Sequence, residues 1–128
     1  TTSREPVFDG KFVSAGAHIN AVGSNFLAKS EIDVETIRRA SRIAVDSVEQ
    51  SRIEAGDLMP AIERGVIQWE SVAELGRIVA GQIAGRASDD DITIFKSNGI
   101  ALEDIAVAIQ IYNRARERSI GEEVSLWG

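Results

Sequence analysis

The stretch GAHINAVG at residues 16–23, together with two further short apolar runs, decides the fold class. From residue 13 to residue 22, small apolar residues alternate at period two, and Gly23 ends the run, a pattern typical of a buried strand. The runs RIAVD at 42–46 and ITIFK at 92–96 predict two further strands. Helical patterns separate the three, so the sequence predicts an α/β fold whose mostly parallel sheet has about three strands.

Helix signals fill the intervals between these strands. Asp33 is a good N-cap for a short helix, and Asp57 is expected to restart a short turn of helix before Gly65. Two pairs have capping-box spacing, Ser47 with Gln50 and Ser71 with Glu74. The helix that begins at Ser71 is expected to end at Gly81.

The longest helix is predicted from Ile100 to about Ser119. It carries two apolar stripes, which predict a helix that is sandwiched between other elements rather than lying on an open surface. The first stripe comprises Leu102, Ile105, Ala106, Ile109 and Tyr112, and the second comprises Ala101, Ala108, Ile111 and Ala115.

Composition narrows the classes of function. The 128 residues are 44% hydrophobic and 27% charged, a globular balance, and the net charge of −6 argues against non-specific binding to nucleic acid. The chain has no cysteine, which excludes disulfides and thiolate chemistry and fits a cytoplasmic location. No apolar run approaches the roughly 20 residues of a membrane span, so no membrane partner is expected.

Catalytic motifs are scarce. His18 is the only histidine, and within an apolar strand it is more simply interpreted as a hydrogen-bonded structural residue. The carboxylates are scattered, so no metal site is predicted. Gly-x-Gly-x-x-Gly, the turn that brings a Rossmann backbone close to a pyrophosphate, does not occur.

Two polar loops are the candidate ligand-binding segments. GSN at 23–25 and SNG at 97–99 each follow the carboxyl end of a predicted strand, where ligands bind in open α/β sheets. Lys29 is close enough in sequence to bring a positive charge to the same place. Spacing alone favours the simpler interpretation, ordinary turns in which glycine and asparagine tolerate positive φ.

Several longer segments then stand in a characteristic order. They are TTSREP at 1–6, GAHINAVG at 16–23, KSEID at 29–33, VD at 45–46, EAGD at 54–57, ELG at 74–76 and ITIFKSNGIALED at 92–104. In order and spacing they resemble the ornithine cyclodeaminase and mu-crystallin family. The likeness covers nearly the whole chain, and although each motif alone is weak, the combination is highly specific.

The resemblance implies a partial domain. Family members are longer, and their fingerprint glycines and substrate-carboxylate residues precede the part that this chain matches. Residues 1–99 are therefore expected to form the later half of a Rossmann-type NAD(P)-binding domain. Residues 100–128 are expected to form a closing helix and tail directed toward a substrate and dimerisation domain, and a homodimer is expected.

The resemblance also implies site residues. Those that match cofactor contacts are His18, Ile19, Asn20 and Ala21, at the strand end on the nicotinamide side, together with Lys29 and Ser97. Asn98 matches a backbone contact to the amino-acid substrate. NAD or NADP is the implied cofactor of the complete protein, and this chain alone is not expected to bind it tightly.

Asn25 departs from the family pattern, because it occupies the slot of the cyclodeaminase's catalytic aspartate. An amide cannot act as a general base at neutral pH. An NAD(P)-dependent oxidoreductase of the ketimine reductase or amino-acid dehydrogenase type, acting on a small imino or amino acid, is therefore a better expectation than ornithine cyclodeamination. Two alternatives remain, a mu-crystallin-like protein that binds NADPH and ligand without turnover, and a fragment that is itself inactive.

Overall fold

The structure, a computed structural model, describes residues 1–125 and contains one parallel sheet. Its strands are β1 (His18–Ala21), β2 (Arg42–Val45), β3 (Ala73–Glu74) and β4 (Thr93–Lys96). The strand order is β1-β4-β2-β3, and every neighbouring pair is parallel. The α/β class and the parallel sheet are therefore confirmed, with β3 as a fourth strand beyond the three expected.

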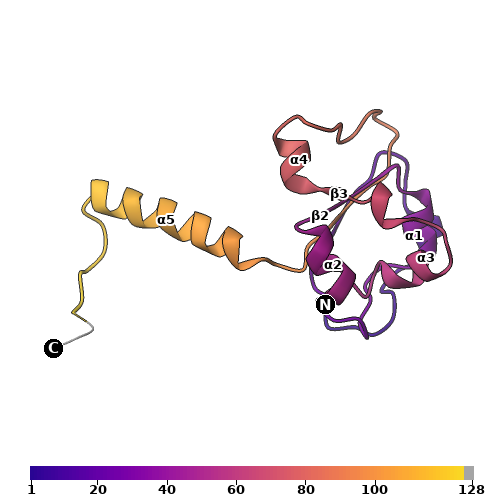
Figure 1. The fold of residues 1–128 in the computed structure, drawn as a ribbon, viewed down its shortest axis with the longest axis horizontal. Coiled ribbons are helices and arrows are strands. Elements are labelled where there is room, and N and C mark those ends of the chain that lie inside the picture. Colours follow the sequence, from indigo (N-terminus) through magenta and orange to yellow (C-terminus); the bar gives the residue numbers. More distant parts are fainter. Residues whose placement is uncertain (126–128) are drawn as a thin grey trace.

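Short helices connect the strands, and a long one follows them (Figure 1). The α-helices are α1 (Val34–Arg39), α2 (Val48–Glu54), α3 (Met59–Glu63), α4 (Leu75–Val79) and α5 (Ala101–Glu117). Two 3-10 helices span Gly10–Phe12 and Trp69–Ser71.

The connections cover opposite faces of the sheet. From β1 through β2 to β3 the chain crosses the sheet in one direction, and the return to β4 crosses it in the other. Because parallel crossovers are right-handed, this reversal places α4 on the face opposite to α1, α2 and α3. Ile37 and Leu58 accordingly pack with Val45 and Ile94 in the main core, whereas Leu75 on α4 lines a pocket on the other face.

The local helix signals at Asp33 and Ser47 are confirmed. Asp33 Oδ1 accepts a hydrogen bond from the backbone N–H of Thr36 at 2.7 Å, and so caps α1. Ser47 Oγ accepts one from the backbone N–H of Gln50 at 3.3 Å, at the start of α2.

The helix expected from Ser71 to Gly81 is wrong. Ser71 ends a 3-10 helix and its hydroxyl donates to Gln68 O, while residues 73 and 74 pair with β2 as the strand β3. The carboxylate of Glu74 accepts from the backbone N–H of Val48 at 3.4 Å instead of capping its own helix. Long-range pairing therefore overrides the local spacing, and α4 keeps only residues 75–79.

The first strand is shorter than its period-two pattern predicts. Gly16 adopts φ +77° and its N–H donates to the carbonyl of Asp90 at 2.9 Å. A left-handed residue interrupts an extended strand, and a Cβ at this position would lie 2.5 Å from the carbonyl oxygen of Asp89. The strand therefore begins only at His18.

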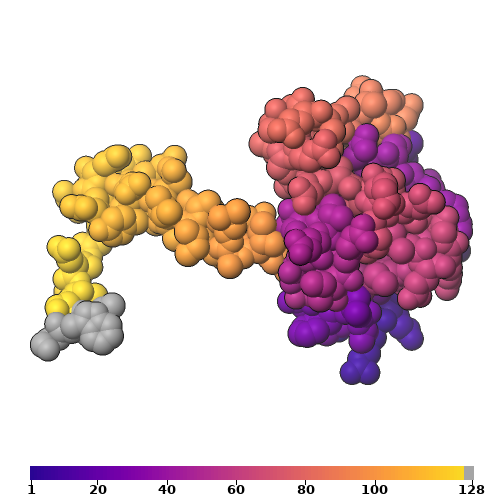
Figure 2. Space-filling model, in the orientation of Figure 1, coloured from indigo at the N-terminus to yellow at the C-terminus, as the bar shows by residue number. Residues whose placement is uncertain are grey.

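The long helix α5 differs most from expectation. It projects away from the body of the fold and none of its residues is buried (Figures 1 and 2). Leu102, Ile105 and Ile109 are 73%, 58% and 52% exposed. The expectation of a sandwiched helix is therefore not met within residues 1–125, because no other element of that part of the chain reaches its apolar stripes. The last three residues of the expected closing segment lie outside the described residues.

One finding bears on membranes. Among residues 1–125, the structure contains no helix whose length and apolar character would let it cross a bilayer.

Candidate functional site

The two candidate segments leave the sheet side by side. Ala21, the last residue of β1, pairs in register with Lys96, the last residue of β4. The backbone N–H of Ser97 donates to the carbonyl of Ala21 at 3.1 Å. The loop at residues 22–32 and the turn at residues 97–99 therefore start from neighbouring strands at the carboxyl edge, the place where parallel sheets bind ligands.

A single carboxylate holds the 97–99 turn. Asp46, directly after β2, accepts hydrogen bonds at its Oδ2 atom from three donors of the turn, each at 2.8 Å. The donors are the hydroxyl of Ser97 and the backbone N–H groups of Asn98 and Gly99. Hydrogen bonds to a charged acceptor are stronger than those to a neutral one. Asp46 thus fixes the backbone of the turn.

This arrangement restricts what Ser97 and Asn98 can offer a ligand. The N–H of Asn98 is occupied by Asp46, so a backbone contact from Asn98 to a substrate has to use its carbonyl oxygen. The side-chain amide of Asn98 donates to Ser51 Oγ at 3.1 Å. Among the described residues, Asp46 Oδ1 and Asn98 Oδ1 are buried acceptors without a hydrogen-bond partner.

The 22–32 loop presents Asn25 and Lys29 at its outer surface. Asn25 is exposed, whereas the neighbouring Ser24 is fully buried and its hydroxyl donates to Lys29 O at 2.9 Å. Lys29 is half-buried, and its Nζ lies 5.0 Å from the centre of the Phe26 ring. The loop therefore exposes an amide and a cation, and a hydrogen bond between Ser24 and Lys29 holds its backbone.

The side chain of Glu31, near the end of this loop, is hydrogen-bonded to the backbone of Gly23, shortly after β1. Its Oε2 atom accepts from the backbone N–H of Gly23 at 2.7 Å, and its Oε1 atom accepts from the ammonium group of Thr1. Burial acts to raise the pKa of Glu31, but these hydrogen bonds outweigh it and hold the pKa below its usual value. Glu31 is therefore an ionised anchor of the loop.

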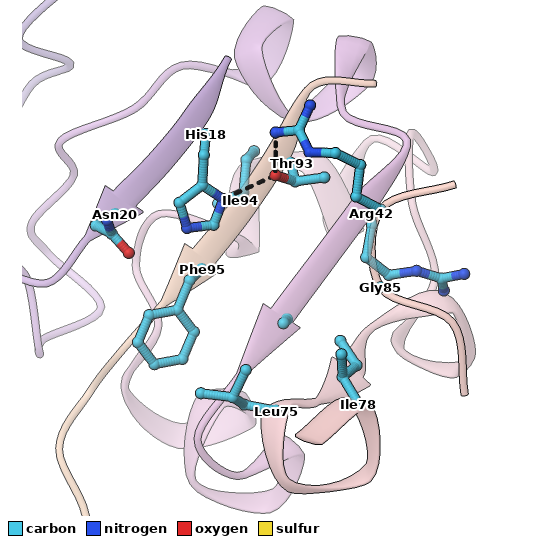
Figure 3. Close-up of a pocket in the computed structure, with 11 residues that line it drawn as sticks. His18, Asn20, Arg42, Leu75, Ile78, Gly85, Thr93, Ile94 and Phe95 are labelled. Atoms are coloured by element: carbon cyan, nitrogen blue, oxygen red, sulfur yellow. Dashed lines mark hydrogen bonds between the residues drawn. The ribbon is translucent and has the colours of Figure 1, made fainter. Parts of the chain in front are cut away.

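His18 and Asn20 lie elsewhere, on the open face of the sheet. Both line a pocket of about 490 Å³ together with Phe95, Leu75 and residues of the segment that follows α4 (Figure 3). His18 Nδ1 lies 2.7 Å from the hydroxyl oxygen of Thr93, in hydrogen-bonding contact. The simpler interpretation of His18, a hydrogen-bonded histidine in a strand, is the one that the geometry supports.

The strand pleat divides the four residues predicted on β1. His18 and Asn20 are exposed, whereas Ile19 packs against the main core and Ala21 is buried in it. Only Ala21 lies directly at the carboxyl edge with Ser97. The structure therefore brings Ala21, the 22–32 loop and the 97–99 turn together, and places His18 and Asn20 on the pocket of the other face.

Sequence reasoning missed three residues that organise this edge. They are Asp46, Asp57 and Lys96. Asp57, which the sequence assigned to a helix start, is instead buried, and α3 begins without a side-chain cap. The available signal was Lys96, since a lysine at the end of a buried strand requires a buried partner of opposite charge. Within residues 1–125, no group of three or more His, Cys, Asp or Glu side chains is arranged to hold a metal ion.

Known proteins resemble this chain over nearly its whole length. Alanine dehydrogenase from Archaeoglobus fulgidus is 41% identical over 99% of the chain, which corresponds to 39% of that protein. The structure of Thermococcus litoralis Δ1-pyrroline-2-carboxylate reductase in complex with NADH and L-proline superposes with a TM-score of 0.86 at 42% identity. That match covers 97% of this chain and 38% of the reductase.

An archaeal alanine dehydrogenase dimer with bound NAD matches with a TM-score of 0.83 at 41% identity, over 99% of this chain and 39% of that chain. The chain thus spans less than two fifths of the length of these relatives. The profile of the ornithine cyclodeaminase/mu-crystallin family matches residues 1–119. On this evidence, and on the parallel sheet that it shares with its solved relatives, the chain belongs to the ornithine cyclodeaminase/mu-crystallin family.

Proposed function

We propose that this chain is the later half of the nucleotide domain of an NAD(P)-dependent oxidoreductase that acts on a small imino or amino acid. The observation that carries the proposal is the meeting of the 22–32 loop and the 97–99 turn at the carboxyl edge of a parallel sheet. Ligands bind at that edge in open α/β folds. Solved relatives with the same fold hold NADH with L-proline, or NAD.

The residues at the edge fit part of a dinucleotide. Ala21 and the 97–99 turn offer small side chains, Gly99 has no heavy atom within 4 Å of its Cβ position, and Lys29 offers a cation. The pyrophosphate site is not expected in this chain, because it requires a glycine turn that leads into a helix N-terminus, and the sequence lacks that turn. When bound, the cofactor would supply the hydride.

Asn25 favours reduction over cyclodeamination. Its exposed amide can orient a water molecule or an imine nitrogen by hydrogen bonding, but it cannot accept a proton as a carboxylate does. In a reduction the cofactor supplies the hydride, so a neutral residue at this position is compatible with the chemistry.

A homodimer is part of the proposal. The relative with bound NAD is described as a dimer. In this chain β1 forms one edge of the sheet, and the apolar stripes of α5 are exposed. Both features are surfaces that association would cover.

The test is turnover by a longer protein that contains this chain together with a preceding glycine-fingerprint half. We expect NADH or NADPH to be oxidised with a cyclic imino acid, or with an α-keto acid and ammonia, and the amino acid to appear in equal amount. Tight binding of reduced cofactor without turnover on either class would instead support the mu-crystallin-like binding protein. Absence of both binding and turnover would contradict the proposal.

A further inference from the structure

Lys96 is buried in a place where a lysine requires a specific reason. It is the last residue of β4, pairs in register with Ala21 and Val45, and its side chain is 0% exposed. Its ammonium group donates a hydrogen bond to the backbone carbonyl of Ser24 and lies 3.1 Å from Asp57 Oδ2. Burying a charge is costly unless it is paired and hydrogen-bonded. Both partners of Lys96 lie at the carboxyl edge, one of them in the 22–32 loop.

Asp57 binds the same loop at its other end. The Asp57 side chain is also 0% exposed, and its Oδ1 atom accepts from the backbone N–H groups of Glu31 at 2.5 Å and Ile32 at 3.2 Å. The hydroxyl of Ser30 donates to the same oxygen at 3.2 Å. Lys96 thus holds the beginning of the 22–32 loop, and Asp57 holds its end.

Gly56, next to Asp57, packs against the backbone of the loop. A Cβ placed on Gly56 would lie 2.2 to 2.7 Å from the carbonyl oxygens of Lys29, Phe26 and Leu27. Backbone therefore packs directly on backbone between the two anchored ends. Asn25 and Lys29, which the proposed function places in the site, lie within this clamped segment.

From this geometry we infer that the Lys96–Asp57 ion pair is a positioning element, which fixes Asn25 and Lys29 at the carboxyl edge of the sheet. The inference rests on the proposed function for the roles of Asn25 and Lys29, but not for the clamping itself. Lys96 and Asp57 do not face a ligand. They act through Ser24 and through residues 30–32.

Two variants separate positioning from stability. Lys96→Met removes the ammonium group but leaves the Asp57 carboxylate buried and unpaired, which lowers stability. Lys96→Met combined with Asp57→Asn removes both charges with little change in volume, and the amide introduced at position 57 would keep an oxygen for the N–H groups of residues 31 and 32. Val72→Ala is the matched control, because it removes buried volume next to β3, at the edge of the sheet farthest from β1.

Hydrogen exchange on the 128-residue chain is the first readout. In the double variant we expect the amide of Lys29, which donates to the carbonyl of Phe26 at 3.0 Å, to exchange at least ~10-fold faster, while those of Glu31 and Ile32 stay protected. Val72→Ala should also raise the rates of amide exchange, but without a selective effect on the 22–32 loop. Unchanged protection of the Lys29 amide in a folded double variant would overturn the inference.

Kinetics of the longer protein is the second readout. If the pair positions Asn25 and Lys29, the double variant should regain the melting temperature lost in Lys96→Met, yet its kcat should stay roughly 10-fold to 100-fold low. A kcat that recovers together with stability would show a merely structural role and contradict the inference. If the unaltered longer protein shows no turnover, the proposed function fails, and the exchange pattern alone still decides whether the pair clamps the loop.

Discussion

The carboxylate of Asp46 accepts a hydrogen bond from the backbone N–H of Asn98 at 2.8 Å, and so joins the end of β2 to the turn that follows β4. These residues are far apart in sequence and meet only because β2 and β4 are neighbours in the sheet. The contact defines the shape of the 97–99 turn and determines which atoms of the turn remain for a ligand.

Replacing Asp46 should loosen this turn and destabilise the fold. Asp46→Ala removes a charged acceptor that serves three donors, and we expect the free energy of unfolding to fall by about 2 kcal/mol. Urea denaturation of the 128-residue chain measures the change. Glu49→Ala, which removes a carboxylate from the first turn of α2, is the control and should change it by less than about 0.5 kcal/mol. Equal effects of the two variants would contradict the role of Asp46.

Asp33 should make stability depend on pH in the acid range. Burial acts to raise its pKa, but hydrogen bonds from the N–H of Gly10 at 2.9 Å and from the hydroxyl and N–H of Thr36 outweigh it and hold the pKa below its usual value. A lowered folded pKa gives stability that is present above the unfolded value of about 4 and is lost as the pH falls through the folded pKa.

The test compares the chain with Asp33→Asn, which keeps an oxygen for capping α1 but has no charge. The unfolding free energy of the unaltered chain should exceed that of Asp33→Asn at neutral pH, and the difference should shrink as the pH falls below about 4. Asp90→Asn, at an exposed carboxylate, is the control. A difference that stays constant with pH would show that the Asp33 charge does not contribute.

The isolated chain should bind NAD(H) weakly or not at all. The pyrophosphate site requires a glycine turn and a helix N-terminus, and the sequence lacks the glycine turn. Isothermal titration of the 128-residue chain with NADH measures the affinity. A dissociation constant in the low micromolar range would refute this prediction.

A longer protein that carries Asn25 should release no ammonia from ornithine, because an amide at that slot cannot take a proton. Asn25→Asp is the informative gain-of-function variant, since it restores a carboxylate at an exposed position with little change in size. Coupled detection of ammonia provides the measurement. Ornithine-dependent release by the unaltered protein would mean that another group serves as the base.

The 128-residue chain should self-associate, most simply as a two-fold dimer. The exposed stripe of α5 and the free edge of β1 are the surfaces available for pairing. Light scattering at micromolar concentration should give a mass above 13.8 kDa that rises with concentration. Ile105→Glu combined with Ile109→Glu should shift the equilibrium toward monomer if α5 is the interface. A mass that stays near 13.8 kDa for the unaltered chain would exclude the dimer.

The sequence by itself determined the features that depend on neighbouring residues. The strands at 42–45 and 93–96 follow from short apolar runs, and the cap at Asp33 follows from a side chain that reaches the N–H of Thr36 three residues later. These interactions are local, so the pattern of the chain is sufficient to predict them. The same apolar runs placed the loops of Asn25, Ser97 and Asn98 after strand ends.

Only the tertiary structure decided how the strand ends are used. Residues 73 and 74 form β3 because β2 offers them a pairing partner, although their spacing to Ser71 favours a helix. Asp57 is a buried anion rather than a helix cap because Lys96 lies opposite it. The partners in each case are distant in the chain, and the energy of pairing two strands or two buried charges depends on their separation in space. The periodicity of the sequence does not predict that separation.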